Sequence, residues 1–185
     1  MENNNNHNAW IQTFTGKKFY PFNPKPEDID IRDIAHALSN ICRFTGHTKR
    51  FHSVAAHSIG VAQLVPESMQ LQALLHDASE AYLCDIARPI KRREDMQPYR
   101  VIECCLQATI YERFGLPATE PPELRQADAR MCGAEALALM EPLIEPECWR
   151  WCTDLVDGKE HVSDLQPANA RLLFLRFFQQ YGGRA

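Results

Sequence analysis

Residues 30–44, DIRDIAHALSNICRF, set the fold class of this chain. Apolar side chains recur here at the spacing i, i+3, i+4 and i+7, which places them on one face of a helix. These side chains belong to Ile31, Ile34, Ala35, Leu38, Ile41 and Cys42. Gly46 is expected to end the helix, because glycine readily adopts the left-handed conformation that closes helices. The stretch therefore predicts an amphipathic helix packed on a core.

The helical period continues along most of the chain. Ser53 is a good N-cap for a helix over residues 54–65, and Ser68 is expected to cap a helix that runs through residues 71–83. Three longer helices are predicted over residues 99–114, 122–140 and 167–181. The segments without a clear helical pattern are residues 85–98 and 149–161.

Strands are expected only near the N-terminus. Residues 10–24 alternate apolar and polar side chains around Thr15-Gly16, which predicts a small hairpin. No Val/Ile-rich run repeats at the spacing of βαβ units. The sequence thus predicts an all-α bundle with a small N-terminal β-hairpin, in one domain over residues 10–185 that follows a disordered tail of residues 1–9.

The composition is that of a soluble globular protein. Of 185 residues 45% are hydrophobic and 24% are charged, so one domain can bury a core without disulfides. The formal net charge is -4, and the short basic run at residues 91–93 is too small for a nucleic-acid surface. We therefore expect no polynucleotide partner. A negatively charged substrate must be held by a few basic groups or by a metal ion.

The cysteines and the apolar runs point to the cytoplasm. The seven cysteines are scattered, form no CxxC pair and in several cases lie in apolar helical contexts, which is typical of buried free thiols in a reducing compartment. No stretch reaches the roughly 18 to 20 apolar residues of a membrane span. The polar N-terminus also lacks the apolar segment of a signal peptide. A cytoplasmic protein with no membrane partner is expected.

Four residues have the types and positions of a metal-ligand set. His76 and Asp77 follow an apolar run, while His57 and Asp128 lie among small apolar residues on other predicted helices. Mixed imidazole and carboxylate ligands suit divalent ions, whose open positions accept water or a phosphate oxygen. Taken singly, His57 would more often be a hydrogen-bonded core histidine and Asp128 a surface acid. Their combination favours one ion in a crevice between helices.

These residues carry a family resemblance. His57, His76-Asp77 and Asp128 match the H…HD…D signature of the HD-domain metal-dependent phosphohydrolases. The segments CRFTG (42–46), ALLHDASEAYLCDIARPIK (73–91) and ADA (127–129) resemble a small subgroup of that family. The subgroup contains bacterial and prophage 5'-deoxynucleotidases and phage dATP triphosphohydrolases. The likeness runs from about Phe14 to Leu139 and is strongest over residues 73–91.

The resemblance implies an all-α HD domain that hydrolyses a phosphate ester or anhydride of a nucleotide with a divalent metal ion. Cobalt, manganese or magnesium is expected, with zinc, nickel or iron as alternatives. Relatives that bind two or more metals carry extra histidines between the HD pair and the final aspartate, and residues 78–127 contain none. One essential ion is therefore expected.

Two acids are candidates for catalysis. Glu80 follows His76 by four residues and Asp77 by three, which on a helix places all three on one face. It could orient or deprotonate the attacking water, a role that the resemblance also suggests. Asp85 matches a second functional acid of the subgroup and could protonate the leaving oxygen or bind the sugar. The alternatives are an exposed helix glutamate and a plain loop acid.

Four residues are candidates for substrate binding because of the resemblance. Arg43 matches a basic residue that contacts phosphate, and Lys91 matches a lysine near it. Phe44 stands where tryptophan is common and could stack on the base or sugar, although a core position is an equal alternative. Pro89 could border the base pocket. His52 stands where relatives more often have tyrosine and receives no role.

The predicted function is removal of phosphate from deoxynucleoside 5'-monophosphates by attack of a metal-activated water. One alternative uses the same residues to release triphosphate from a dNTP, dATP especially. Another is a nucleotide-binding helical module that has lost catalysis. The C-terminal helix over residues 167–181 is more apolar than one core face requires, so it is expected in the core, with the seam of a homodimer as the alternative. The resemblance also implies a homo-oligomer, a dimer or larger.

Overall fold

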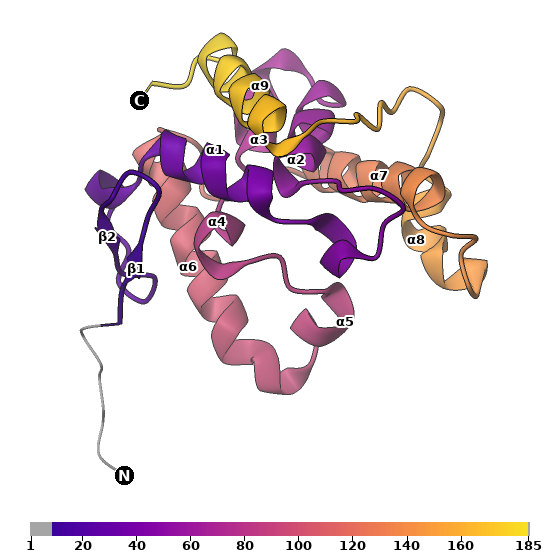
Figure 1. The fold of residues 1–185 in the computed structure, drawn as a ribbon, viewed down its shortest axis with the longest axis horizontal. Helices are drawn as coiled ribbons and strands as arrows, with labels where there is room; N and C mark the ends of the chain where they lie inside the picture. Colours follow the sequence, from indigo (N-terminus) through magenta and orange to yellow (C-terminus); the bar gives the residue numbers. More distant parts are fainter. Residues whose placement is uncertain (1–8, 185) are drawn as a thin grey trace.

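A computed structural model of the chain describes residues 9–184 and has an all-α fold with a small N-terminal hairpin, as predicted (Figure 1). The strands are β1 (Ile11–Gln12) and β2 (Lys18–Phe19). The α-helices are α1 (Ile31–Asn40), α2 (Val54–Gln63), α3 (Gln70–Leu74), α4 (Glu80–Leu83), α5 (Arg88–Lys91), α6 (Gln97–Arg113), α7 (Pro122–Leu139), α8 (Arg150–Thr153) and α9 (Pro167–Gln180). Short 3-10 turns are η1 (Pro26–Asp28), η2 (Arg43–Gly46), η3 (Glu67–Met69), η4 (Glu94–Met96) and η5 (Pro146–Trp149). The predicted tail, residues 1–9, lies outside the described residues except for Ala9.

Aromatic contacts and hydrogen bonds attach the hairpin to the helical body, among them the bonds that the Thr15 amide and hydroxyl donate to the Asp33 carboxylate, at 2.7 and 2.9 Å. β1 and β2 pair antiparallel, with Ile11 opposite Phe19 and Gln12 opposite Lys18. Phe19 is fully buried, and its ring stacks on that of Tyr82 in α4 with centroids 3.9 Å apart. Burial of two aromatic rings in one contact offsets the weak pairing of so short a sheet.

Helix α2 forms the centre of the fold. It packs against α1, α3, α7 and α9, and all of its residues except Gln63 are buried. Its small side chains allow the neighbouring helices to approach closely. The predicted N-cap is confirmed, since the Ser53 hydroxyl accepts a hydrogen bond from the Ala56 amide at 3.1 Å. The central helix therefore holds His57 in a fixed position inside the core.

Helix α9 is a core helix. It lies against α1 and α2 at the top of Figure 1, and Ala170, Phe174 and Phe178 belong to the hydrophobic core. Leu172 remains 61% exposed on the opposite side. Gly182 follows the helix with a φ of 90°, as predicted for its end.

The prediction of one continuous helix over residues 71–83 is wrong. The chain forms two short helices, α3 and α4, joined by tighter turns over residues 75–79. The expected cap at Ser68 is also wrong, because Ser68 lies in η3 and no side chain caps α3. The break places the His76-Asp77 pair in a turn instead of on a regular helix.

A side chain of α6 stabilises this break. Gln107 donates its amide N–H to the Leu75 carbonyl at 2.8 Å and accepts a hydrogen bond from the Ser79 amide at 3.0 Å. These are backbone groups that a continuous helix would pair internally. The Leu75 carbonyl also accepts from the Ala78 amide at 3.0 Å, so it is chiefly the Ser79 amide that Gln107 keeps from being unpaired in the turn.

Two other boundaries differ from the prediction. α1 ends at Asn40, since Ile41 is extended and its carbonyl accepts a hydrogen bond from the Val54 amide at 3.0 Å. Gly46, with a φ of 81°, closes the turn η2 and not the helix. The segment 149–161, which shows no helical pattern, contains the short helix α8.

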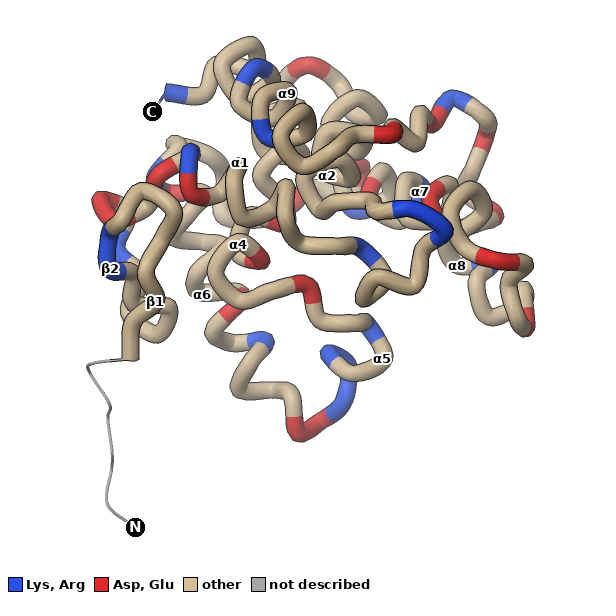
Figure 2. The backbone as a smooth tube through the Cα atoms, in the orientation of Figure 1, with Lys and Arg blue, Asp and Glu red and all other residues tan. Residues whose placement is uncertain are grey.

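The described residues contain no helix that is long and apolar enough to cross a membrane. Figure 2 shows Lys and Arg dispersed among Asp and Glu along the described chain. All seven cysteines are free, as predicted, but only Cys132 and Cys152 are buried, so the expectation of buried thiols is wrong for the other five.

Helices α7 and α8 meet at Gly133. A Cβ atom at this position would lie 2.5 Å from the carbonyl oxygen of Cys152, so only glycine permits the contact. We expect Gly133→Ala to lower the free energy of unfolding by about 1–3 kcal/mol, measured by urea denaturation. Gly60→Ala is the matched control, because there the added Cβ meets the flexible Met131 side chain at 2.8 Å and the neighbour can move. Equal losses for both variants would contradict the close backbone contact.

Candidate metal centre

Three of the four predicted ligands meet in the structure. His57 from α2, His76 from the turn after α3 and Asp128 from α7 each offer one ligand atom, and these atoms all lie within 4.8 Å of one another. Both histidines are buried. The group could hold a metal ion, as the sequence pattern predicts.

Both imidazoles turn the same nitrogen toward the centre of this group. His57 Nδ1 lies 2.8 Å from Glu135 Oε1, and His76 Nδ1 lies 2.8 Å from the Ala73 carbonyl oxygen. A backbone carbonyl can only accept, so Nδ1 of His76 is the donor, and a carboxylate requires the same of His57. The lone pair of each Nε2 is then available to a metal ion, the arrangement in which second partners hold metal-binding histidines.

The centre of the group favours a positive charge. Nε2 of His57 lies 3.2 Å and Nε2 of His76 lies 3.8 Å from the same Asp128 oxygen, so three acceptor atoms face one another. Nε2 of His76 is buried and has no hydrogen-bond partner. Burial favours the neutral form of each of these side chains, but their charged neighbours outweigh it. The carboxylates raise the pKa of both histidines, and the histidines hold the pKa of Asp128 well below its usual range. A divalent cation fits the same demand.

Asp77 borders the group without being part of the set of three. Its Oδ2 lies 3.3 Å from Nε2 of His76 and 3.8 Å from Nε2 of His57. Burial tends to raise the pKa of Asp77, but His76 outweighs it and lowers this pKa to about 2. The carboxylate is therefore ionised beside both imidazoles, where it can serve as a fourth ligand.

Sequence reasoning did not identify Glu135, which links the group to its surroundings. Glu135 is fully buried and binds three side chains: His57, His52 at 3.0 Å and the Arg43 guanidinium at 3.2 Å. Burial opposes its charge, yet His57 and Arg43 hold the pKa of Glu135 below its usual range. The available signal was its position seven residues after Asp128, which is two helical turns along the same face of α7.

Arg43 brings a cation to the edge of the group. Besides Glu135, its guanidinium lies 3.9 Å from an Asp85 oxygen and 4.0 Å from an Asp77 oxygen. It begins the turn η2, in which Phe44 and Thr45 have φ values of 52° and 55°. Left-handed backbone costs roughly 1–2 kcal/mol for each non-glycine residue, so other contacts must stabilise this turn.

Glu80 lies near the group formed by His57, His76 and Asp128, called the metal group below. One of its two carboxylate oxygens has no hydrogen-bond partner. Glu80 is 4% exposed, its Oε2 is the oxygen without a partner, and its Oε1 lies 3.7 Å from Nζ of Lys91. Burial and the charges of Asp77 and Asp85 raise the pKa of Glu80 well above its usual range. Lys91 is itself held by Glu103 at 2.7 Å. Burial also raises the pKa of Asp85.

Two predicted substrate residues lie further out. Pro89 is exposed on α5. Phe44 is half-buried and pairs with Trp149, with ring centroids 6.4 Å apart. Neither the structure nor its contacts assign them a ligand.

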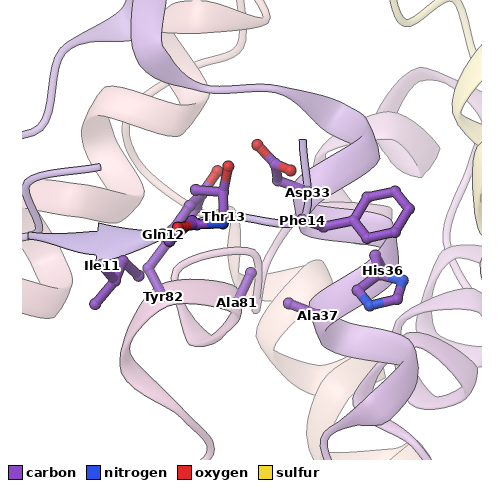
Figure 3. A pocket seen from close by; sticks show the side chains of 9 residues that line it. All are labelled: Ile11, Gln12, Thr13, Phe14, Asp33, His36, Ala37, Ala81 and Tyr82. Atoms are coloured by element: carbon purple, nitrogen blue, oxygen red, sulfur yellow. The ribbon is translucent and has the colours of Figure 1, made fainter. Parts of the chain in front are cut away.

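A cavity lies elsewhere, between the hairpin and helices α1 and α4 (Figure 3). Its volume is about 360 Å³, and its lining includes the hairpin residues Ile11–Phe14, Asp33 and His36 of α1, and Tyr82 of α4. The cavity has no Lys or Arg in its lining, and none of the predicted site residues belongs to it.

Comparison with known proteins gives two clear relatives. The chain is 44% identical over 127 residues to the uncharacterized protein YfdR of Escherichia coli, an alignment that covers 69% of this chain and 70% of YfdR. It is 37% identical over 128 residues to the uncharacterized protein RCAP_rcc00048 of Rhodobacter capsulatus, covering 64% of this chain and 65% of that protein. No family model matches the chain.

Proposed function

The chain belongs to the protein family of Escherichia coli YfdR, and from its site we propose that it is an HD-type, metal-dependent phosphohydrolase that removes phosphate from deoxynucleoside 5'-monophosphates. The observation that carries the proposal is the convergence of His57, His76 and Asp128. The two imidazoles turn Nε2 toward one carboxylate, next to the Arg43 cation and the buried Glu80. A metal ion, an anion-binding group and a carboxyl group are the parts that metal-assisted hydrolysis of a phosphate ester uses.

The residues that would hold the ion are His57, His76 and Asp128, with Asp77 beside them. When bound, a divalent ion lowers the pKa of water and withdraws charge from phosphate oxygens. The fixed orientation of both histidines means that little reorganisation is needed for binding. Mixed nitrogen and oxygen ligands suit cobalt, manganese, iron, nickel or zinc, and magnesium to a lesser degree.

Glu80 is the proposed acceptor of the proton from water. Its free Oε2 can take a hydrogen bond from a water molecule, which is the contact that a general base needs. Nζ of Lys91 stays close to the other oxygen and limits the movement of the carboxyl group. Arg43 is the proposed phosphate ligand, because a guanidinium matches two phosphate oxygens at once.

Asp85 is the proposed source of the proton for the leaving oxygen. It lies 3.9 Å from Arg43, on the side of the group where the cation would hold the phosphate. Its raised pKa favours the protonated form that a general acid needs.

The charge of the site favours a monophosphate over a triphosphate. Arg43 and Lys91 are the cationic side chains that contact its acids, and each already pairs with a carboxylate, Glu135 or Glu103. A triphosphate carries more negative charge than a monophosphate. The carboxylates of Asp77, Asp85 and Glu80 would repel that extra charge, and Arg43 and Lys91 would offset little of the repulsion.

A substrate panel tests the proposal. Protein loaded with Co²⁺, Mn²⁺ or Mg²⁺ is incubated with dNMPs, NMPs and dNTPs, and the products are identified by ion-exchange chromatography. Inorganic phosphate from dNMPs is expected. Triphosphate from dATP would instead favour the triphosphohydrolase, and no turnover by metal-loaded protein would favour a binding module that has lost catalysis.

Replacement of Glu80 by glutamine should separate chemistry from metal binding. Glu80→Gln keeps the size of the side chain but removes the base, so kcat is expected to fall by about 10²–10⁴-fold while bound metal stays stoichiometric. Turnover and metal content are measured on the same preparation. Glu123→Gln, at the exposed start of α7, is the control. Loss of the metal from Glu80→Gln would give Glu80 a structural role and contradict the assignment.

A further inference from the structure

The segment η5–α8 reaches the candidate site from a distant part of the sequence. Trp149 pairs with Phe44 of η2, and Trp151 packs against Arg88 of α5, whose guanidinium carbon lies 3.8 Å from the ring centroid. η2 begins with Arg43, and α5 ends with Lys91. Two tryptophans from one short segment thus contact the two elements that carry the cations of the site.

This segment is held rigidly relative to the metal group. α8 packs backbone against backbone on α7 at Gly133, between Asp128 and Glu135 in sequence. Cys152 is fully buried, and its thiol and the Thr153 hydroxyl both donate to the Trp149 carbonyl, at 3.1 and 3.2 Å. Trp149 therefore has a fixed backbone, positioned by the same helix that carries a proposed metal ligand.

The rings of Phe44 and Trp149 are not packed face to face. Their centroids lie 6.4 Å apart with an interplanar angle of 46°, whereas the stacked pair Phe19–Tyr82 has centroids 3.9 Å apart. Both rings are half-buried. A tilted pair at this distance is an ordinary aromatic contact in which neither ring covers the face of the other, and the half-buried Trp149 can therefore still receive a planar group.

The distance to the phosphate-binding cation suits a nucleotide. The guanidinium carbon of Arg43 lies 5.4 Å from the Phe44 ring centroid, and the same guanidinium lies 4.0 Å from Asp77 beside the metal group. One side chain thus connects the aromatic pair to the place where phosphate would bind. In a nucleotide the sugar makes the corresponding connection between phosphate and base.

We propose that Trp149, contributed by the C-terminal part of the chain, forms a wall of the nucleobase site beside Phe44, the residue for which the family resemblance already implies stacking on the nucleotide. The inference rests on the proposed nucleotide function and extends it to the residue that recognises the base. Every base has a π face, so stacking here gives affinity with little selection among bases. Trp151 is already occupied by Arg88 and helps to hold α5 beside this wall.

Calorimetric binding of two probes tests the proposal on metal-loaded protein that carries Glu80→Gln, so that the probes bind but are not consumed. The probes are dAMP and 2-deoxyribose 5-phosphate, which lacks the base. This background protein should bind dAMP more tightly than the sugar phosphate, and adding Trp149→Ala should weaken dAMP about tenfold while leaving the sugar phosphate unchanged. Trp149→Phe should restore most of the affinity. Trp10→Ala, on the exposed tryptophan before β1, is the control and should match the background protein.

Two results would overturn the inference. Unchanged dAMP binding by Trp149→Ala would remove Trp149 from the base site, and equal weakening of both probes would make its role structural. Hydrolysis assays on the same Trp149 variants with Glu80 intact separate this outcome from failure of the proposed function. If dAMP binds through Trp149 but is not hydrolysed, the base site stands and the phosphohydrolase proposal fails.

Discussion

Asp128→Asn is expected to lower the affinity for a divalent ion by more than about 100-fold and to abolish turnover at ordinary metal concentrations. The carboxylate faces Nε2 of both histidines, and its Oδ1 lies 3.2 Å from Nε2 of His57. Asparagine keeps the size of the side chain but offers a neutral oxygen, which removes the negative charge that compensates the ion. Metal content by mass spectrometry and phosphate release measure the two effects.

The control for this substitution is Asp154→Asn, at the exposed end of α8, which should retain both metal and activity. Asp77→Asn and His57→Ala are expected to lose turnover through the same loss of metal. A stoichiometric ion in Asp128→Asn, or normal activity of metal-replete Asp77→Asn, would show that the ion is held elsewhere.

Glu135→Ala is expected to lower the free energy of unfolding by about 3–5 kcal/mol, measured by urea denaturation of the metal-free protein. The fully buried carboxylate binds Arg43, His52 and His57, and its removal leaves a guanidinium buried without its partner. Glu135→Gln keeps some of these hydrogen bonds and should fold. Its metal affinity should still fall about 10- to 100-fold, because the partner that orients His57 is weakened.

The stability effect at Glu135 should depend on pH in a defined direction. The pKa of this carboxyl is lowered in the folded state, so its contribution is fully present above the unfolded pKa of about 4.3 and is lost as pH falls toward the folded pKa. The gap in unfolding free energy between wild type and Glu135→Gln should therefore narrow below about pH 4. Glu123→Ala, at the exposed start of α7, should show no such gap. A gap that widens in acid would contradict the role of the carboxylate.

The helices and the three residues that could hold a metal ion were predictable because they depend on residue type and period. The helical spacing of apolar residues predicted α1, α2, α7 and α9, and the Ser53 cap defined the start of α2. His57 and Asp128 were identifiable as unusual polar residues among small apolar ones, each on its own helix. Such features are local, so a single sequence carries them.

The break at residues 75–79 was not predictable, because the local sequence is a good helix. It depends on Gln107, an ordinary polar residue of α6 until the fold brings its amide to Leu75 and Ser79. The break also removes the argument that Glu80 shares a helical face with His76. Glu80 reaches the site through the turn instead.

Glu135 and Trp149 were missed for a related reason. Glu135 looks like one polar residue in the apolar end of α7, and its importance comes from Arg43 and His52, which are far away in sequence. Trp149 lies in a segment with no clear period, and its partner Phe44 is remote. A residue whose role is to position other side chains can be recognised only once the tertiary structure shows which side chains it contacts.

The most direct test of the proposed function is one reaction in ¹⁸O-labelled water. Metal-loaded protein is incubated with dAMP, and the products are followed by ³¹P nuclear magnetic resonance and mass spectrometry. The account predicts deoxyadenosine without label and inorganic phosphate that carries ¹⁸O, with the reaction stopped by a chelator and restored by the ion. Intact dAMP in the presence of a stoichiometrically bound ion would contradict it.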